Sequence, residues 1–92
     1  METAKNLLNE LREEIEVIDS RLVPLWEERM RLARRAAEYK SGLGLPVLDC
    51  EREELLWERW RGFLADPELT EELREFFEAV LSSSKRWQSH FV

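Results

Sequence analysis

The stretch AKNLLNELREEIEVIDSRLVPLWEERMRLARRAAEYKS, residues 4–41, decides the fold of this chain of 92 residues. It consists almost entirely of good helix formers, and its apolar side chains recur at steps of three and four residues, the spacing of a heptad seam. That seam comprises Leu11, Ile15, Ile18, Leu22, Leu25, Leu32, Ala36 and Tyr39. The pattern predicts a first helix of about 38 residues, roughly 57 Å in length.

Pro24 is the residue of this stretch that most disfavours a helix. Proline has no N–H to donate to the carbonyl of Ser20, so a kink or a local loosening is expected there. The apolar spacing nevertheless continues in the same register beyond Pro24. We therefore expect one continuous helix over residues 4–41.

Two shorter helices are expected after the run SGLGLP, residues 41–46, because glycine and proline end helices. One covers about residues 49–64 with Asp49 as N-cap, and the other covers about residues 67–90 with Asp66 as cap and Pro67 in its first position. Their inward apolar residues are Leu55, Leu56, Trp60, Phe63 and Leu64, then Leu69, Leu73, Phe76, Phe77, Val80, Leu81 and Phe91. No segment alternates as a strand does, so we expect an all-α fold in a single domain, residues 1–92.

A single copy of this chain can bury only a small core. Cys50 is the sole cysteine, so no disulfide can form within the chain, and no set of His and Cys has metal-ligand spacing. The two shorter helices cannot cover the apolar face of the long one, whereas the same helix of a second chain can. We expect three-helix protomers intertwined as a helical-bundle homodimer.

The charge of the chain excludes some classes of function. A formal net charge of −6 and a pI near 4.9 argue against nucleic-acid binding, which needs a basic face. The first sixteen residues, METAKNLLNELREEIE, lack the apolar run of a signal peptide, and no stretch approaches the roughly 20 apolar residues of a membrane span. We expect a cytoplasmic protein with no membrane partner.

Polar residues interrupt the inward face of every expected helix. Arg29 falls between Leu25 and Leu32 on the first seam, and burying such groups costs several kcal/mol unless they have partners. The others are Asp49, Arg52 and Glu53 on the second helix and Ser84 and Gln88 on the third. Most of them have a structural explanation when taken singly. Arg29 can pair with Glu53, Asp49 can be a simple N-cap, Ser84 can bond its own backbone, and Gln88 can be a helix-surface residue. Together with Lys40 they indicate a pocket for a small polyanion that also bears a hydroxyl.

Helix geometry separates the cations into two groups. Arg29 and Lys40 are eleven residues apart, so they share a face within roughly 20° and lie about 16 Å apart. Arg12 precedes Arg29 by seventeen residues, which places it about 25 Å away and turned by roughly 100°. Arg12 cannot join that group within its own chain, but a partner chain can supply it.

These residues, in this order, resemble the all-helical chorismate mutase family. The matching text is Leu11-Arg12-Glu13-Glu14-Ile15, Ile18-Asp19, Glu28-Arg29-Met30, Tyr39-Lys40, Leu45-Pro46-Val47-Leu48-Asp49, Arg52-Glu53, Ser84 and Gln88. The resemblance implies a dimer with two sites, each built from both chains. It also implies conversion of chorismate to prephenate by a pericyclic rearrangement in aromatic amino-acid biosynthesis, without cofactor, metal or covalent intermediate.

The resemblance also implies a role for each polar residue. Arg29, Arg52 and, from the partner chain, Arg12 would hold the two substrate carboxylates. Asp49 and Glu53 would receive the ring hydroxyl, and Lys40 and Gln88 would donate to the ether oxygen. Ser84 would line the end of the pocket that takes the ring carboxylate.

Two alternatives stay open. An isochorismate pyruvate-lyase has the same fold and needs similar cations, although the acids at Asp49 and Glu53 suit the hydroxyl of chorismate better. A non-catalytic helical dimer or regulatory subunit that keeps the fold is the other, and the complete set of polar residues weighs against it.

Overall fold

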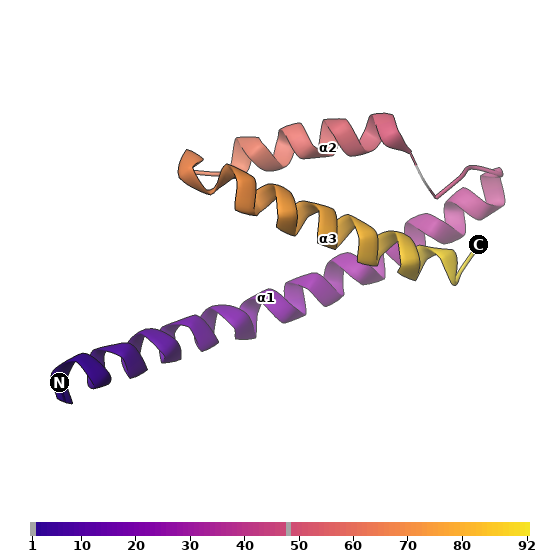
Figure 1. The fold of residues 1–92 in the computed structure, drawn as a ribbon. Coiled ribbons are helices and arrows are strands. Elements are labelled where there is room, and N and C mark those ends of the chain that lie inside the picture. Colours follow the sequence, from indigo (N-terminus) through magenta and orange to yellow (C-terminus); the bar gives the residue numbers. More distant parts are fainter. Residues whose placement is uncertain (1, 48) are drawn as a thin grey trace. The chain divides into compact units, whose positions relative to one another are not determined.

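The computed structural model describes residues 2–47 and 49–92 (Figure 1). Along the chain lie α1 (Glu2–Leu43), α2 (Cys50–Phe63), the 3-10 helix η1 (Pro67–Leu69) and α3 (Thr70–Ser89). The part of the chain that the structure describes holds no strand, and its first helix is much the longest. The all-α fold with three helices and a long first one is thus confirmed. The chain divides into two compact units, Met1–Arg31 and Leu32–Val92.

Helix α1 continues through Pro24, as the unbroken apolar register predicts. Its end has a clear local cause. Gly44 takes a φ of +71°, its N–H donates to the carbonyl of Ser41 at 3.2 Å, and the N–H of Leu45 donates to the carbonyl of Lys40 at 2.8 Å. This pair of bonds is the Schellman ending, which a glycine in the left-handed region makes possible. It fixes the helix end at the turn that carries Lys40.

In the unit Leu32–Val92, α2 and α3 form an antiparallel hairpin (Figure 1). Asp49 caps α2 as expected, its carboxylate accepting the N–H of Arg52 at 3.1 Å. Asp66 accepts the N–H of Glu68 at 3.0 Å, with Pro67 in the first helical position. The cap is where we expected it, but the helix expected over 67–90 opens with one 3-10 turn and becomes α-helical at Thr70.

The core of this hairpin is aromatic and small. Phe77 is 2% exposed, and the rings of Trp57 and Trp60 lie 5.3 Å and 5.0 Å from it. Ala37 of α1 is fully buried, whereas Ala36, which we placed on the seam, is exposed. Ala37 lies about 100° of helix rotation from Ala36, so the face of α1 that is buried within one copy is not the seam face, which was expected to meet a second chain.

Most of the other apolar residues predicted to face inward stay exposed in one copy of the chain. Leu55 is 62%, Phe63 82% and Phe76 47% exposed. The first five seam residues of α1 show between 44% and 61% of their surface: Leu11, Ile15, Ile18, Leu22 and Leu25. Their expected burial is not achieved within one copy, because its three helices offer too little surface to cover them. No helix of the described residues is long and apolar enough to cross a membrane.

Candidate active site

A buried polar network joins the end of α1 to α3. The Lys40 ammonium donates to Gln88 Oε1 at 3.2 Å, and Gln88 Nε2 donates to Ser84 Oγ at 3.1 Å. Ser84 is 4% and Gln88 8% exposed, so both depend on protein partners for their hydrogen bonds. Sequence reasoning assigned all three residues to one site, and the structure brings them together.

The helix ending and the loop that follows place the Lys40 side chain. Its ammonium also donates to the carbonyl of Val47 at 3.5 Å, so the chain that leaves the Schellman turn folds back over it. An ammonium carries three N–H donors, and these two acceptors do not exhaust it. Lys40 is half-buried, which strengthens its electrostatic effect relative to a cation in bulk water.

Aromatic contacts hold the C-terminal end of α3 against α1. The guanidinium carbon of Arg34 lies 4.2 Å from the centre of the Phe91 ring, a cation–π contact. The rings of Trp87 and Phe91 are 4.8 Å apart and nearly perpendicular. Trp87 and Phe91 flank Gln88 in the sequence, so these contacts hold the segment that carries Gln88.

The polar residues at the start of α2 divide into two kinds. Asp49 and Arg52 are exposed, and the Asp49 carboxylate is engaged as the N-cap. Glu53 is less exposed and turns toward α3, where its Oε1 lies 3.0 Å from the ammonium of Lys85. An ion pair of Glu53 with Arg29 was the structural alternative at the sequence level. In the structure Glu53 pairs with Lys85, a residue that sequence reasoning missed.

The signal that could have found Lys85 is its place beside Ser84 and three residues before Gln88. The residue spacing of α3 alone does not predict that Glu53 of α2 contacts Lys85. That depends on how the two helices are rotated about their axes.

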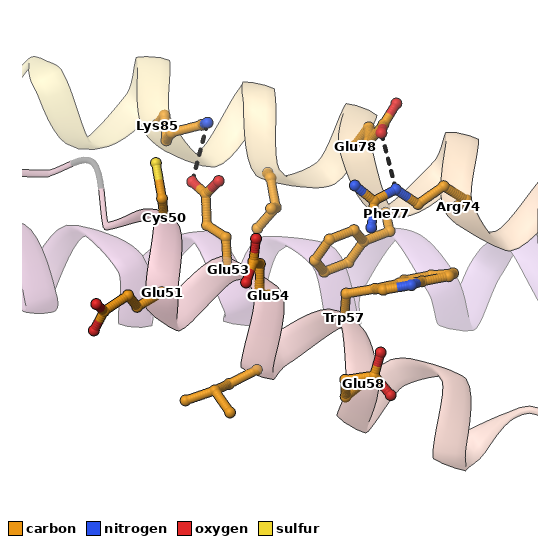
Figure 2. A pocket seen from close by; sticks show the side chains of 12 residues that line it. Cys50, Glu51, Glu53, Glu54, Trp57, Glu58, Arg74, Phe77, Glu78 and Lys85 are labelled. Atoms are coloured by element: carbon orange, nitrogen blue, oxygen red, sulfur yellow. Dashed lines mark hydrogen bonds and ion pairs between the residues drawn. The ribbon is translucent and has the colours of Figure 1, made fainter.

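An open groove of about 960 Å³ runs between α2 and α3 (Figure 2). Glu53 and Lys85 face each other at the end near the start of α2, and Trp57 and Phe77 lie farther along. A second ion pair, Arg74 with Glu78 at 2.9 Å, stands on the α3 wall. The groove thus combines an apolar floor with five acidic and two basic side chains, and Lys40, Ser84 and Gln88 are not among the residues that line it.

Two cations that the sequence analysis assigned to the site, Arg12 and Arg29, belong to the other unit, Met1–Arg31. Arg12 is exposed on α1, and Arg29 is half-buried there. Both lie on the helix that the sequence assigned to them. In residues 2–47 and 49–92 no group of three or more His, Cys, Asp and Glu side chains is arranged to hold a metal ion.

Comparison with known proteins places this chain among helical enzymes. The family profile described as chorismate mutase type II matches residues 11–89. The chorismate mutase of Methanocaldococcus jannaschii is 31% identical over 86 residues, which cover 92% of this chain and 87% of that protein. The bifunctional chorismate mutase/prephenate dehydratase of Aquifex aeolicus is 36% identical over 87 residues, or 86% of this chain but 24% of that protein.

No solved structure gives a significant match to this chain. The family profile, however, spans most of α1, all of α2 and α3, and every residue of the Lys40–Gln88–Ser84 network. This chain belongs to the type II chorismate mutase family.

Proposed function

We propose that this protein is a chorismate mutase, an isomerase that converts chorismate to prephenate in aromatic amino-acid biosynthesis. The observation that carries the proposal is the network in which the Lys40 ammonium meets the buried amide of Gln88. A half-buried cation beside a buried amide matches the charge that develops in this rearrangement. The family membership and the named relatives support the same reaction.

The rearrangement is intramolecular, and its electrons move in one cyclic array. The C–O bond of the enol ether breaks as a C–C bond forms at the far end of the enolpyruvyl group. Negative charge grows on the ether oxygen as the C–O bond lengthens. Lys40 donates to this oxygen, and it does so most strongly in the transition state, which is the requirement for a higher rate. No proton passes to a side chain, so no catalytic base is needed.

Gln88 takes part by turning its amide. Without substrate it presents its oxygen to Lys40, because an ammonium can only donate, and its NH₂ group to Ser84. To donate to the ether oxygen, the amide must rotate so that Nε2 faces the substrate. The Ser84 hydroxyl can then donate to Oε1, since a hydroxyl serves as either donor or acceptor. Ser84 thus keeps the buried amide satisfied in both states.

The arginines orient the substrate, and the acids select it. In the proposed site Arg29, Arg52 and the partner's Arg12 bind the two carboxylates, because a guanidinium forms paired bonds with a carboxylate. These contacts hold the enolpyruvyl chain near the ring. The conformational entropy that the uncatalysed reaction loses on reaching its transition state is therefore lost already on binding. Asp49 and Glu53 accept the ring hydroxyl, and Asp49 does so while its carboxylate caps α2.

The site we propose needs two copies of the chain. The exposed seam residues of α1 are large and apolar, and one copy leaves them facing water. Pairing of α1 with the α1 of a second copy would bury them and bring the partner's Arg12 to the site. A cytoplasmic location stays a prediction from composition.

The proposal is tested by following the loss of chorismate absorbance with purified protein. Prephenate as the product is the expected result. If isochorismate is consumed instead, with release of pyruvate and salicylate, the protein is the lyase. If neither substrate is consumed by folded dimer, the reading as a non-catalytic helical dimer or regulatory subunit replaces the proposal.

A further inference from the structure

We infer that Lys85 is a positioning residue of this active site, holding the Glu53 carboxylate so that its second oxygen receives the ring hydroxyl of the substrate. The inference rests on the proposed function and adds one residue to the proposed active site. Lys85 would thereby set the preference for a hydroxylated substrate. The observation behind it is the 3.0 Å contact between the Lys85 ammonium and Glu53 Oε1 (Figure 2).

This ion pair differs from the others found among residues 2–47 and 49–92. Three of those pairs link residues three or four apart on one helix: Arg34 with Glu38, Arg61 with Glu58 and Arg74 with Glu78. Their side chains are between 47% and 66% exposed. The pair of Lys85 and Glu53 instead joins α3 to α2, with side chains 36% and 27% exposed. Solvent screens it less than the other three, and it spans two helices.

The contact leaves half of the carboxylate available. A carboxylate has two oxygens that each accept hydrogen bonds, and Lys85 occupies Oε1. A free glutamate side chain samples several rotamers, and ordering it on binding would cost conformational entropy. With Lys85 in place this ordering is done before the substrate arrives. Oε2 is then the oxygen that can accept the hydroxyl.

The pair also explains how an acid can serve a dianionic substrate. A glutamate near two substrate carboxylates repels them, and the repulsion is strong in a partly buried site. The Lys85 ammonium offsets the charge of Glu53 at hydrogen-bond distance. Glu53 therefore keeps its strength as an acceptor while the pair as a whole carries no net charge toward the substrate.

Lys85 lies next to residues of the proposed site. It lines the same groove as Glu53 and follows Ser84 directly in α3, the helix that also carries Gln88. It acts on the substrate through Glu53, so its effect must depend on the substrate hydroxyl. A purely structural tie between α2 and α3 would have no such dependence.

The test compares two rigid bicyclic dicarboxylates that mimic the transition state, one with the ring hydroxyl and one without it. Their inhibition constants are measured on the dimeric enzyme for the wild type, Lys85→Met and Lys85→Arg. We expect Lys85→Met to weaken binding of the hydroxylated inhibitor about tenfold and to change the other by less than about twofold. Lys85→Arg, which retains the cation, should restore most of the preference. Arg61→Met, which removes a surface ion pair of α2, is the matched control and should leave both constants unchanged.

A second comparison separates positioning from packing. In a Glu53→Gln background, Lys85→Met should no longer alter the preference between the two inhibitors, because its effect passes through that carboxylate. Equal weakening of both inhibitors by Lys85→Met would overturn the inference, and so would no change in either. Wild-type protein that fails to consume chorismate would refute the proposed function itself, a result distinguishable from an active enzyme that is indifferent to Lys85.

Discussion

The ammonium of Lys40 and the amide oxygen of Gln88 lie 3.2 Å apart, although 48 positions separate the two residues in the sequence. The contact connects the last turn of α1 to the last turn of α3. The turn that ends α1 positions Lys40, and aromatic packing holds the segment that carries Gln88. Together they place a cation where the proposed reaction needs one.

Lys40→Met should lower kcat by about 10²- to 10³-fold with a smaller effect on KM, because it removes a donor to the developing oxyanion. The substitution keeps much of the apolar stem. Circular dichroism and sedimentation should show the same helix content and the same oligomeric state as the wild type. Lys5→Met, at an exposed position of α1, is the control and should retain full activity. Wild-type kinetics in Lys40→Met would remove this residue from the site.

Mixing inactive Arg12→Ala chains with inactive Lys40→Ala chains should restore about a quarter of wild-type activity. Random exchange makes about half of the dimers mixed, and each mixed dimer holds one intact site of two if the sites are shared. Chorismate turnover before and after verified subunit exchange provides the measurement. An exchanged mixture that stays inactive contradicts a site built from both chains.

Ile18→Lys should convert the proposed dimer to a monomer or an unfolded chain and abolish activity, because it puts a charge in the centre of the α1 seam. Sedimentation equilibrium across protein concentrations follows the change. Glu16→Lys also introduces a lysine in α1, but on the face opposite the seam, and should leave the dimer intact. The shared-seam proposal fails if Ile18→Lys remains an active dimer.

Ser84→Ala should lower the free energy of unfolding by about 1–2 kcal/mol, because it leaves the buried amide of Gln88 without its hydroxyl partner. It should also lower kcat if Ser84 supports both orientations of that amide. Urea denaturation and steady-state kinetics measure the two effects. Ser82→Ala, at an exposed position of α3, supplies the comparison and should change neither quantity.

Asp49 has two proposed roles that substitutions can separate. Asn caps a helix about as well as Asp, so Asp49→Asn should keep the stability of α2, whereas Asp49→Ala should cost about 1 kcal/mol. If Asp49 also accepts the substrate hydroxyl, both variants should raise KM. Thermal denaturation and kinetics of the pair decide the question. Wild-type KM in Asp49→Asn would leave Asp49 as a cap alone.

The sequence by itself determined the helices of this chain and its family. The Asp49 cap, the Asp66–Pro67 start and the glycine that ends α1 are local signals, and each acts within a few residues of chain. The long apolar register was enough to carry α1 through Pro24. The ordered polar residues were enough to indicate the family.

Only the tertiary structure decided which faces and which side chains meet. It buries Ala37 within one copy, pairs Glu53 with Lys85, and turns the oxygen of Gln88 toward Lys40. These outcomes depend on how each helix is rotated about its axis against its neighbours. One residue of helix is about 100° of rotation, so periodicity along a single helix leaves that angle undetermined, and packing between helices sets it.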